Sequence, residues 1–174
     1  MTMNGFIRIL TLAVLAMASG CASYTWKSSV PEAYRTVSVP VFENRTNAAE
    51  LGPIATQYTL REFQREGTFK IRRSGDAAIE VQAAIVKADR HAFTYDRAYG
   101  TRGRSYRYVV SAEVSIIDKK AGKVLVNNRK YTTETTFLSQ GDLLTGQRNA
   151  AARIAQDLGR QIVDDLTAWS FDAK

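Results

Sequence analysis

Hydrophobic and polar residues alternate along five segments of the chain, and such alternation predicts β-strands. The five segments are residues 35–42, 69–73, 77–87, 105–118 and 123–137. The turn DKKAGK connects the last two, so we expect them to form a long hairpin. Residues 88–103 alternate less clearly and contain Tyr95, Tyr99, Gly100 and Gly103, so we expect a loop there. One face of the longest strand would carry Tyr106, Tyr108, Val110, Ala112, Val114 and Ile116.

Two other segments repeat apolar residues every three or four positions, the spacing of an amphipathic helix. The first covers residues 51–66, with Pro53 in its first turn and Gly67 as a C-terminal cap. The second runs over residues 145–169 and ends at Trp169. The order β-α-β-β-β-β-α predicts an α+β fold, a two-layer sandwich. In it, two amphipathic helices pack on one face of a mostly antiparallel sheet of four or five strands. We expect a single domain over residues 35–170 and a short tail, 171–174.

The amino terminus has the pattern of a signal peptide. Arg8 and the free amino group give a positive start, and residues 6–18 are almost wholly apolar. This run is shorter than the about 20 residues of a transmembrane helix. A short hydrophobic anchor or a buried helix is the alternative reading. Residues 18–21, Ala-Ser-Gly-Cys, resemble a bacterial lipobox, with Ala18 where leucine is most frequent. The resemblance implies that residues 1–20 are removed, that Cys21 carries the lipid, and that residues 21–34 are a tether.

Ala22 follows the lipid-bearing cysteine, whereas an aspartate at that position favours retention in the inner membrane in related lipoproteins. The lipobox and Ala22 together imply a protein anchored by lipid in the outer membrane, on its periplasmic side. Two or more acyl chains anchor a protein durably, since each buried CH₂ contributes about 0.8 kcal/mol. A periplasmic location excludes nucleic acid as the expected partner.

The composition argues against an enzyme or a metal protein. Cys21 is the only cysteine, which excludes an internal disulfide, and His91 is the only histidine, which argues against a zinc site. Asp164 and Asp165 diverge on a helix and are expected to be solvated. The glycines of residues 100–104 lack the lysine of a phosphate-binding loop. We therefore expect no catalytic residues, no metal and no cofactor apart from the covalent lipid.

The net charge is +7, and removal of residues 1–20, whose single charged side chain is Arg8, lowers it to +6. Six cations lie between Lys87 and Arg107, interleaved with tyrosines, against only two aspartates. We expect Arg107 to come close to Arg129 across the hairpin. Arginine binds phosphate with two hydrogen bonds, so the cluster favours an anion site, although a solvated basic rim would have the same pattern.

The order of these motifs resembles the LptE family of lipopolysaccharide-assembly lipoproteins. The resemblance rests on "TVSVPVFENRT", "REFQREGTFKI", "DAAIEVQAAI", the hairpin "YRYVVSAEVSIIDKKAGKVLVNNRKY" and "IVDDLTAW", and it covers residues 21–169. It implies a non-enzymatic plug and partner of the LptD β-barrel that binds lipopolysaccharide. "VPVFENRT" is also similar to lipoproteins of curli secretion and to penicillin-binding-protein activators, which are the alternatives. The resemblance places lipopolysaccharide binding near a strand-loop end, which here means Arg97, Arg102, Arg104, Arg107, Arg129 and Lys130.

Overall fold

The computed structural model describes residues 30–95, 103–138, 142–169 and 171; for Phe93, Tyr95 and Arg104 it describes the backbone only. A short 3-10 helix, η1 (Glu32–Tyr34), precedes the first strands. The elements that follow are β1 (Thr36–Ser38), β2 (Glu43–Asn44), α2 (Leu51–Glu66), β3 (Lys70–Ile71), β4 (Ile79–Tyr95), β5 (Gly103–Asp118), β6 (Lys123–Leu138) and α3 (Leu143–Thr167).

The strands form one mixed sheet in the order β3-β1-β4-β5-β6, with β2 pairing beside β1 on the same side of β4. β4, β5 and β6 are antiparallel, whereas β1 is parallel to β3 and β4, and β2 is parallel to β4. The α+β class is therefore confirmed, with six strands rather than four or five and with more parallel pairing than expected. Of the strand predicted over residues 35–42, only Thr36–Ser38 forms, as β1. It ends before Pro40, which cannot donate a ladder hydrogen bond, and β2 begins after the predicted range.

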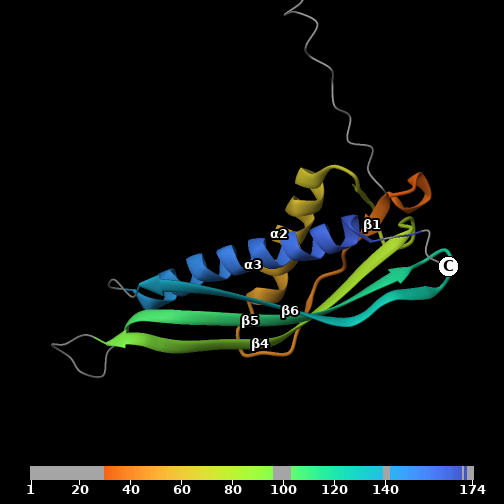
Figure 1. Cartoon of the computed structure of the whole chain (residues 1–174). Helices are drawn as coiled ribbons and strands as arrows, with labels where there is room; N and C mark the ends of the chain where they lie inside the picture. The colour runs from red at the N-terminus through yellow and green to blue at the C-terminus, as the bar shows by residue number, and fades with distance from the viewer. Residues whose placement is uncertain (1–29, 96–102, 139–141, 170, 172–174) are drawn as a thin grey trace, which may run out of the picture.

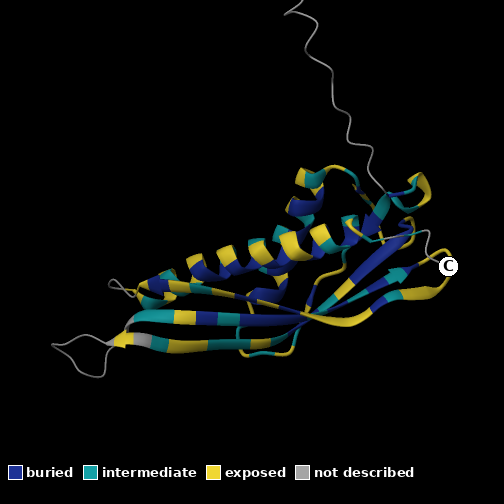
Figure 2. Ribbon diagram, viewed as in Figure 1, coloured by how far each residue is buried: buried dark blue, intermediate teal, exposed yellow. Residues whose placement is uncertain are grey.

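Both helices pack on one face of the sheet, as the alternation predicts (Figure 1). α3 lies mainly over β6 and β5, and α2 packs against α3 and the short strands. The sheet contributes Tyr108, Val110, Ala112, Val114 and Ile116, all buried, to the core. The helix faces that meet them are buried and the opposite faces are exposed (Figure 2). None of the described helices lies on the opposite face of β4, β5 and β6, which we call the outer face.

The loop expected over residues 88–103 is wrong in its first half, because β4 continues to Tyr95 and pairs with β5 as far as Gly103. The alternation weakens there because Ala88 and Arg90 take positions on the helix-facing side that Ile79, Val81 and Ile85 hold earlier in the strand. The antiparallel partner, whose own alternation is regular, holds this half of β4 in the sheet. Tyr99 and Gly100 lie outside the described residues.

The helix ends follow from local chemistry. Gly67 adopts φ 82°, a left-handed conformation, and its N–H donates to the Phe63 carbonyl as a C-terminal cap. Asp142 caps α3, because its carboxylate accepts hydrogen bonds from the backbone N–H groups of Leu144 and Thr145. Donation by the Thr145 hydroxyl, together with these N–H groups, lowers the pKa of Asp142. α3 therefore begins two residues before the predicted start.

The first and the last described parts of the chain pack together. Val30 is buried in the core, and the Tyr34 ring stacks on that of Phe171 with ring centres 5.0 Å apart. Val30 and Tyr34 lie in the range expected for the tether, residues 21–34, and Phe171 lies in the range expected for the tail, residues 171–174. Neither helix in the described part of the chain is long and apolar enough to span a membrane.

Candidate functional site

The outer face is polar along most of its length. Residues directly opposite each other on antiparallel strands point to the same face, which gives cross-strand rows. One row is His91, Arg107 and Thr136, and a second is Asp89, Val109 and Glu134. The next rows are Lys87, Ser111 and Thr132, and then Ala84, Glu113 and Lys130.

Arg107 and Lys130 are the two described cationic candidates on the outer face. Both are exposed, and they lie in rows six residues apart along β5. At about 3.3 Å per residue, this separation is about 20 Å. Lys130 stands opposite Glu113, whereas Arg107 lies near the far end of the hairpin, opposite His91 on β4. The two cations therefore do not form one compact anion site.

Arg129 lies on the other face of the sheet, so the expected approach of Arg107 to Arg129 is wrong. Arg129 is opposite Val114, on the helix-facing side, and its Nη1 lies 2.7 Å from Oδ2 of Asp165 on α3. The Tyr131 hydroxyl donates to the same oxygen at 2.7 Å. Burial, and then the hydrogen bond to Asp165 and its charge, raise the pKa of Tyr131 to about 12. Asp165, although its side chain is 40% exposed, thus links α3 to β6, whereas Asp164 is exposed as expected.

The other candidates lie outside what the structure describes. Cys21, Arg97 and Arg102 are outside the described residues, and Arg104 is described only as a backbone position at the start of β5. That these arginines extend a basic surface around Arg107 stays a prediction.

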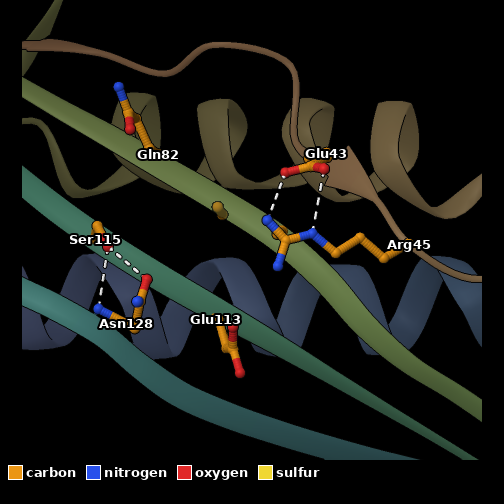
Figure 3. A pocket seen from close by; sticks show the side chains of 8 residues that line it. Glu43, Arg45, Gln82, Glu113, Ser115 and Asn128 are labelled. Atoms are coloured by element: carbon orange, nitrogen blue, oxygen red, sulfur yellow. Dashed lines mark hydrogen bonds and ion pairs between the residues drawn. The ribbon is translucent and has the colours of Figure 1, made fainter.

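A shallow polar hollow of about 180 Å³ lies where β2 pairs with β4 (Figure 3). It forms because Ala84, a small residue, stands between Glu43 on β2 and Glu113 on β5 in one cross-strand row. Ser115 and Asn128 line its far side and bond to each other through Ser115 Oγ and Asn128 Oδ1 at 3.1 Å.

Glu43 and Arg45 form a two-bond ion pair at the rim of the hollow. Arg45 Nε and Nη2 donate to the two carboxylate oxygens at 3.1 and 2.9 Å. Arg45 lowers the pKa of Glu43, and Glu43 raises the pKa of Arg45, first through these hydrogen bonds and then through charge. With Glu113 and two amides nearby, the hollow can accept and donate hydrogen bonds to a polar partner. The pair was not singled out from the sequence, although two residues at i and i+2 in "FENRT" share a face of a strand.

The described residues form no arrangement typical of a catalytic or metal centre. His91 is exposed, and its Nε2 is 4.0 Å from Asp89, which also pairs with Lys87. Within the described residues no three His, Cys, Asp or Glu side chains lie close enough to hold a metal ion.

The fold and the polar outer face define the protein as a two-layer α+β domain with an open, polar sheet. Comparison with family models gives a match to LptE, described as lipopolysaccharide-assembly, over residues 34–166. The match covers most of the chain, so this protein belongs to the LptE family. The family is one of non-enzymatic lipoproteins. None of the curated protein sequences compared with the chain matches it.

Two solved structures share the fold. A lipoprotein of Caulobacter crescentus CB15 is 17% identical, with a TM-score of 0.56 over 79% of this chain and 92% of its own. A protein of Chlamydia trachomatis is 13% identical, with a TM-score of 0.53 over 79% of this chain and 98% of its own. Rare lipoprotein B of Shewanella oneidensis is 13% identical, with a TM-score of 0.48 over 76% and 94%.

Proposed function

We propose that this protein is an outer-membrane lipoprotein that assists lipopolysaccharide assembly as the plug and partner of an LptD-type β-barrel. The lipid on Cys21 anchors it on the periplasmic side. The observation that carries the proposal is the LptE family match over residues 34–166. The same match favours lipopolysaccharide assembly over curli secretion or activation of a penicillin-binding protein. The protein works by binding and catalyses no reaction.

The outer face supports the plug role. The interior of a large β-barrel is polar, so a domain seated in it needs a polar surface and a core that is stable on its own. The rows from His91 to Lys130 supply hydrogen-bonding and charged groups, while most of the buried apolar side chains of these strands are directed to the helices. The outer face is therefore the surface that we assign to the barrel wall.

Lipopolysaccharide carries phosphates and acidic sugars, and a chain of net charge +6 after processing attracts such a polyanion. We place the contact at the far end of the β4–β5 hairpin, with Arg107 and its neighbours in sequence, Arg97, Arg102 and Arg104. Lys130 is a second contact further along the outer face. Arg129 contributes to the fold through Asp165.

The test is affinity purification of the mature lipoprotein from detergent-solubilised outer membranes of its host. The proposal predicts recovery of a large β-barrel in equal amount. Glu134→Arg, a charge reversal on the outer face, should reduce this recovery. Asp157→Arg, the same reversal at an exposed position of α3, should leave it unchanged. Recovery of no barrel would contradict the proposal, and equal recovery with both variants would contradict the assignment of the face.

A further inference from the structure

The helix-facing side of β4 changes character halfway along the strand. Ile79, Val81 and Ile85 in the first half are buried in the core. In the second half the same side carries Ala88 and Arg90, neither of them buried. α3 lies mainly over β6 and β5, so this half of β4 is left beside an open space. The chain places small and polar side chains where a covered strand would have large apolar ones.

The open space is a cavity of about 580 Å³, which we call the β4 groove. Its floor is formed by Ala88, Arg90 and Tyr108. One wall is the segment that leads into α2, residues 47–50, which Asn44 holds in place by donating from Nδ2 to the Ala48 carbonyl at 2.6 Å. The groove therefore separates this segment from the edge of β4.

The opposite wall is the first turn of α3. Leu144 is 61% exposed there, and the side-chain oxygen Oε1 of Gln147 accepts a hydrogen bond from Arg90 Nη1. A second cavity of about 350 Å³, lined by Glu50, Ile54, Leu144, Gln147 and Arg148, shares three of these residues with the β4 groove. Ile54 and Leu144 give this compartment an apolar character, so the groove joins a polar part to an apolar part.

Two features of the groove, one side-chain hydroxyl and one strand edge, have no hydrogen-bond partner among the described residues. The Tyr108 hydroxyl is buried and makes no hydrogen bond. Burial, and after it the nearby charge of Glu50, raise the pKa of Tyr108. The edge of β4 beside the groove pairs with β2 only as far as Ile85. The last hydrogen bond there runs from the Arg45 N–H to the Ile85 carbonyl, at 2.9 Å. Residues 86–95 pair with β5 on one side and with no described strand on the other.

We propose that the β4 groove binds an extended polypeptide segment of a partner protein, which adds as a strand to the free edge of residues 86–95. Strand addition satisfies main-chain groups and takes its specificity from pockets for alternate side chains. One apolar side chain of the segment enters the compartment of Ile54 and Leu144, and a carbonyl accepts the Tyr108 hydroxyl. The segment continues the line of β2 along β4.

The charges around the groove favour a polypeptide over an anionic lipid. Arg90 and Arg148 are balanced by Glu50 and Asp89, so the lining has little net charge. The other long free edge, that of β6, is partly occupied, since Arg153 Nη2 donates to the Thr136 carbonyl at 3.2 Å. The proposal goes beyond the assembly function and does not depend on which protein supplies the segment.

The test uses a phage library of 12-residue peptides panned against the purified mature chain, with affinity then measured by fluorescence anisotropy. The proposal predicts that selected peptides slow hydrogen exchange of backbone amides within residues 86–95. N-methylation at alternate peptide positions should abolish binding, because it removes the ladder donors. Tyr108→Phe should weaken binding about five- to tenfold without lowering the unfolding midpoint.

Leu144→Asp should weaken peptide binding at least tenfold. Val41→Asp is the matched control, since Val41 is 71% exposed and lies away from the groove, and it should leave affinity unchanged. Selection of no peptide, or of peptides that leave exchange at residues 86–95 unchanged, would overturn the proposal. The proposal would also be overturned if Leu144→Asp left peptide binding unchanged and instead removed binding to phosphatidylglycerol vesicles, or removed dimerisation of the chain measured by sedimentation.

Discussion

Gly159 sits where α3 crosses α2, and replacing it with alanine should destabilise the protein. A Cβ at residue 159 would lie 2.9 Å from Thr59 Cα and 3.0 Å from Thr59 N. Ordinary contacts between carbon atoms are about 3.5–4.0 Å, so the helices would have to move apart by about 0.5–1 Å. The atoms in the way belong to the α2 backbone, which cannot turn aside as a side chain can.

The magnitude follows from two opposing effects. Separating helices packed around Phe63, Leu158 and Ile162, all essentially fully buried, costs about 1–3 kcal/mol, as overpacking of a dense core does. Alanine in place of glycine inside a helix returns about 1 kcal/mol. We therefore expect Gly159→Ala to lower the free energy of unfolding by about 1 kcal/mol, which is about 2–4 °C in Tm for a chain of this size.

The assay is urea denaturation followed by circular dichroism. The control is the pair Gln161→Gly and Gln161→Ala, because residue 161 is exposed on the same helix and their difference measures the propensity effect alone. A Gly159→Ala variant that is more stable than the wild type, by about the propensity difference, would refute the claim that close approach of the helices requires glycine.

Three further predictions follow from buried hydrogen bonds and from the basic residues. Tyr131→Phe removes the hydrogen bond to Asp165 and should lower the free energy of unfolding by about 1 kcal/mol in thermal melts; an unchanged melt would mean that the link between α3 and β6 contributes nothing. Hydrogen bonding from Ser74 lowers the pKa of buried Glu80, so this carboxylate adds stability above pH 4.5 that is lost as pH falls through its folded pKa. Glu80→Gln should flatten the loss of stability between about pH 6 and 3 in denaturation curves, and an identical pH profile would contradict this. Replacing the hairpin-end arginines Arg102, Arg104 and Arg107 with alanine should weaken lipopolysaccharide binding in a filter assay. The control replaces three exposed cations near β3, Lys70, Arg72 and Arg73, and should weaken binding less. Equal effects would mean that the hairpin end is only a solvated basic rim.

The fold could be predicted from the sequence where the apolar period is regular. α2 matches its predicted range, 51–66, because its apolar spacing and Gly67 both mark it. The prediction of a loop is wrong for residues 88–95. Apolar and polar residues alternate clearly only in a strand that has one face covered by a helix, and no described helix covers this half of β4. Strand pairing to β5, a long-range contact, decides its conformation there.

The candidate site was less predictable, because register determines it. Arg129 and Lys130 are neighbours in sequence and point to opposite faces of the sheet, so they cannot share one ligand site. Asp165 finds its partners on β6 only once α3 is docked. The distance between Arg107 and Lys130 depends on strand pairing, which no local pattern encodes.

The measurement that tests the central claim most directly is the amount of lipopolysaccharide at the cell surface when the protein is depleted in its host. Surface accessibility to a lipopolysaccharide-modifying enzyme added outside the cell would report it. The account predicts that surface lipopolysaccharide falls, and that it is restored by the wild-type chain but not by a Cys21→Ala chain expressed at the same level. Normal surface lipopolysaccharide after full depletion would contradict a role in its assembly.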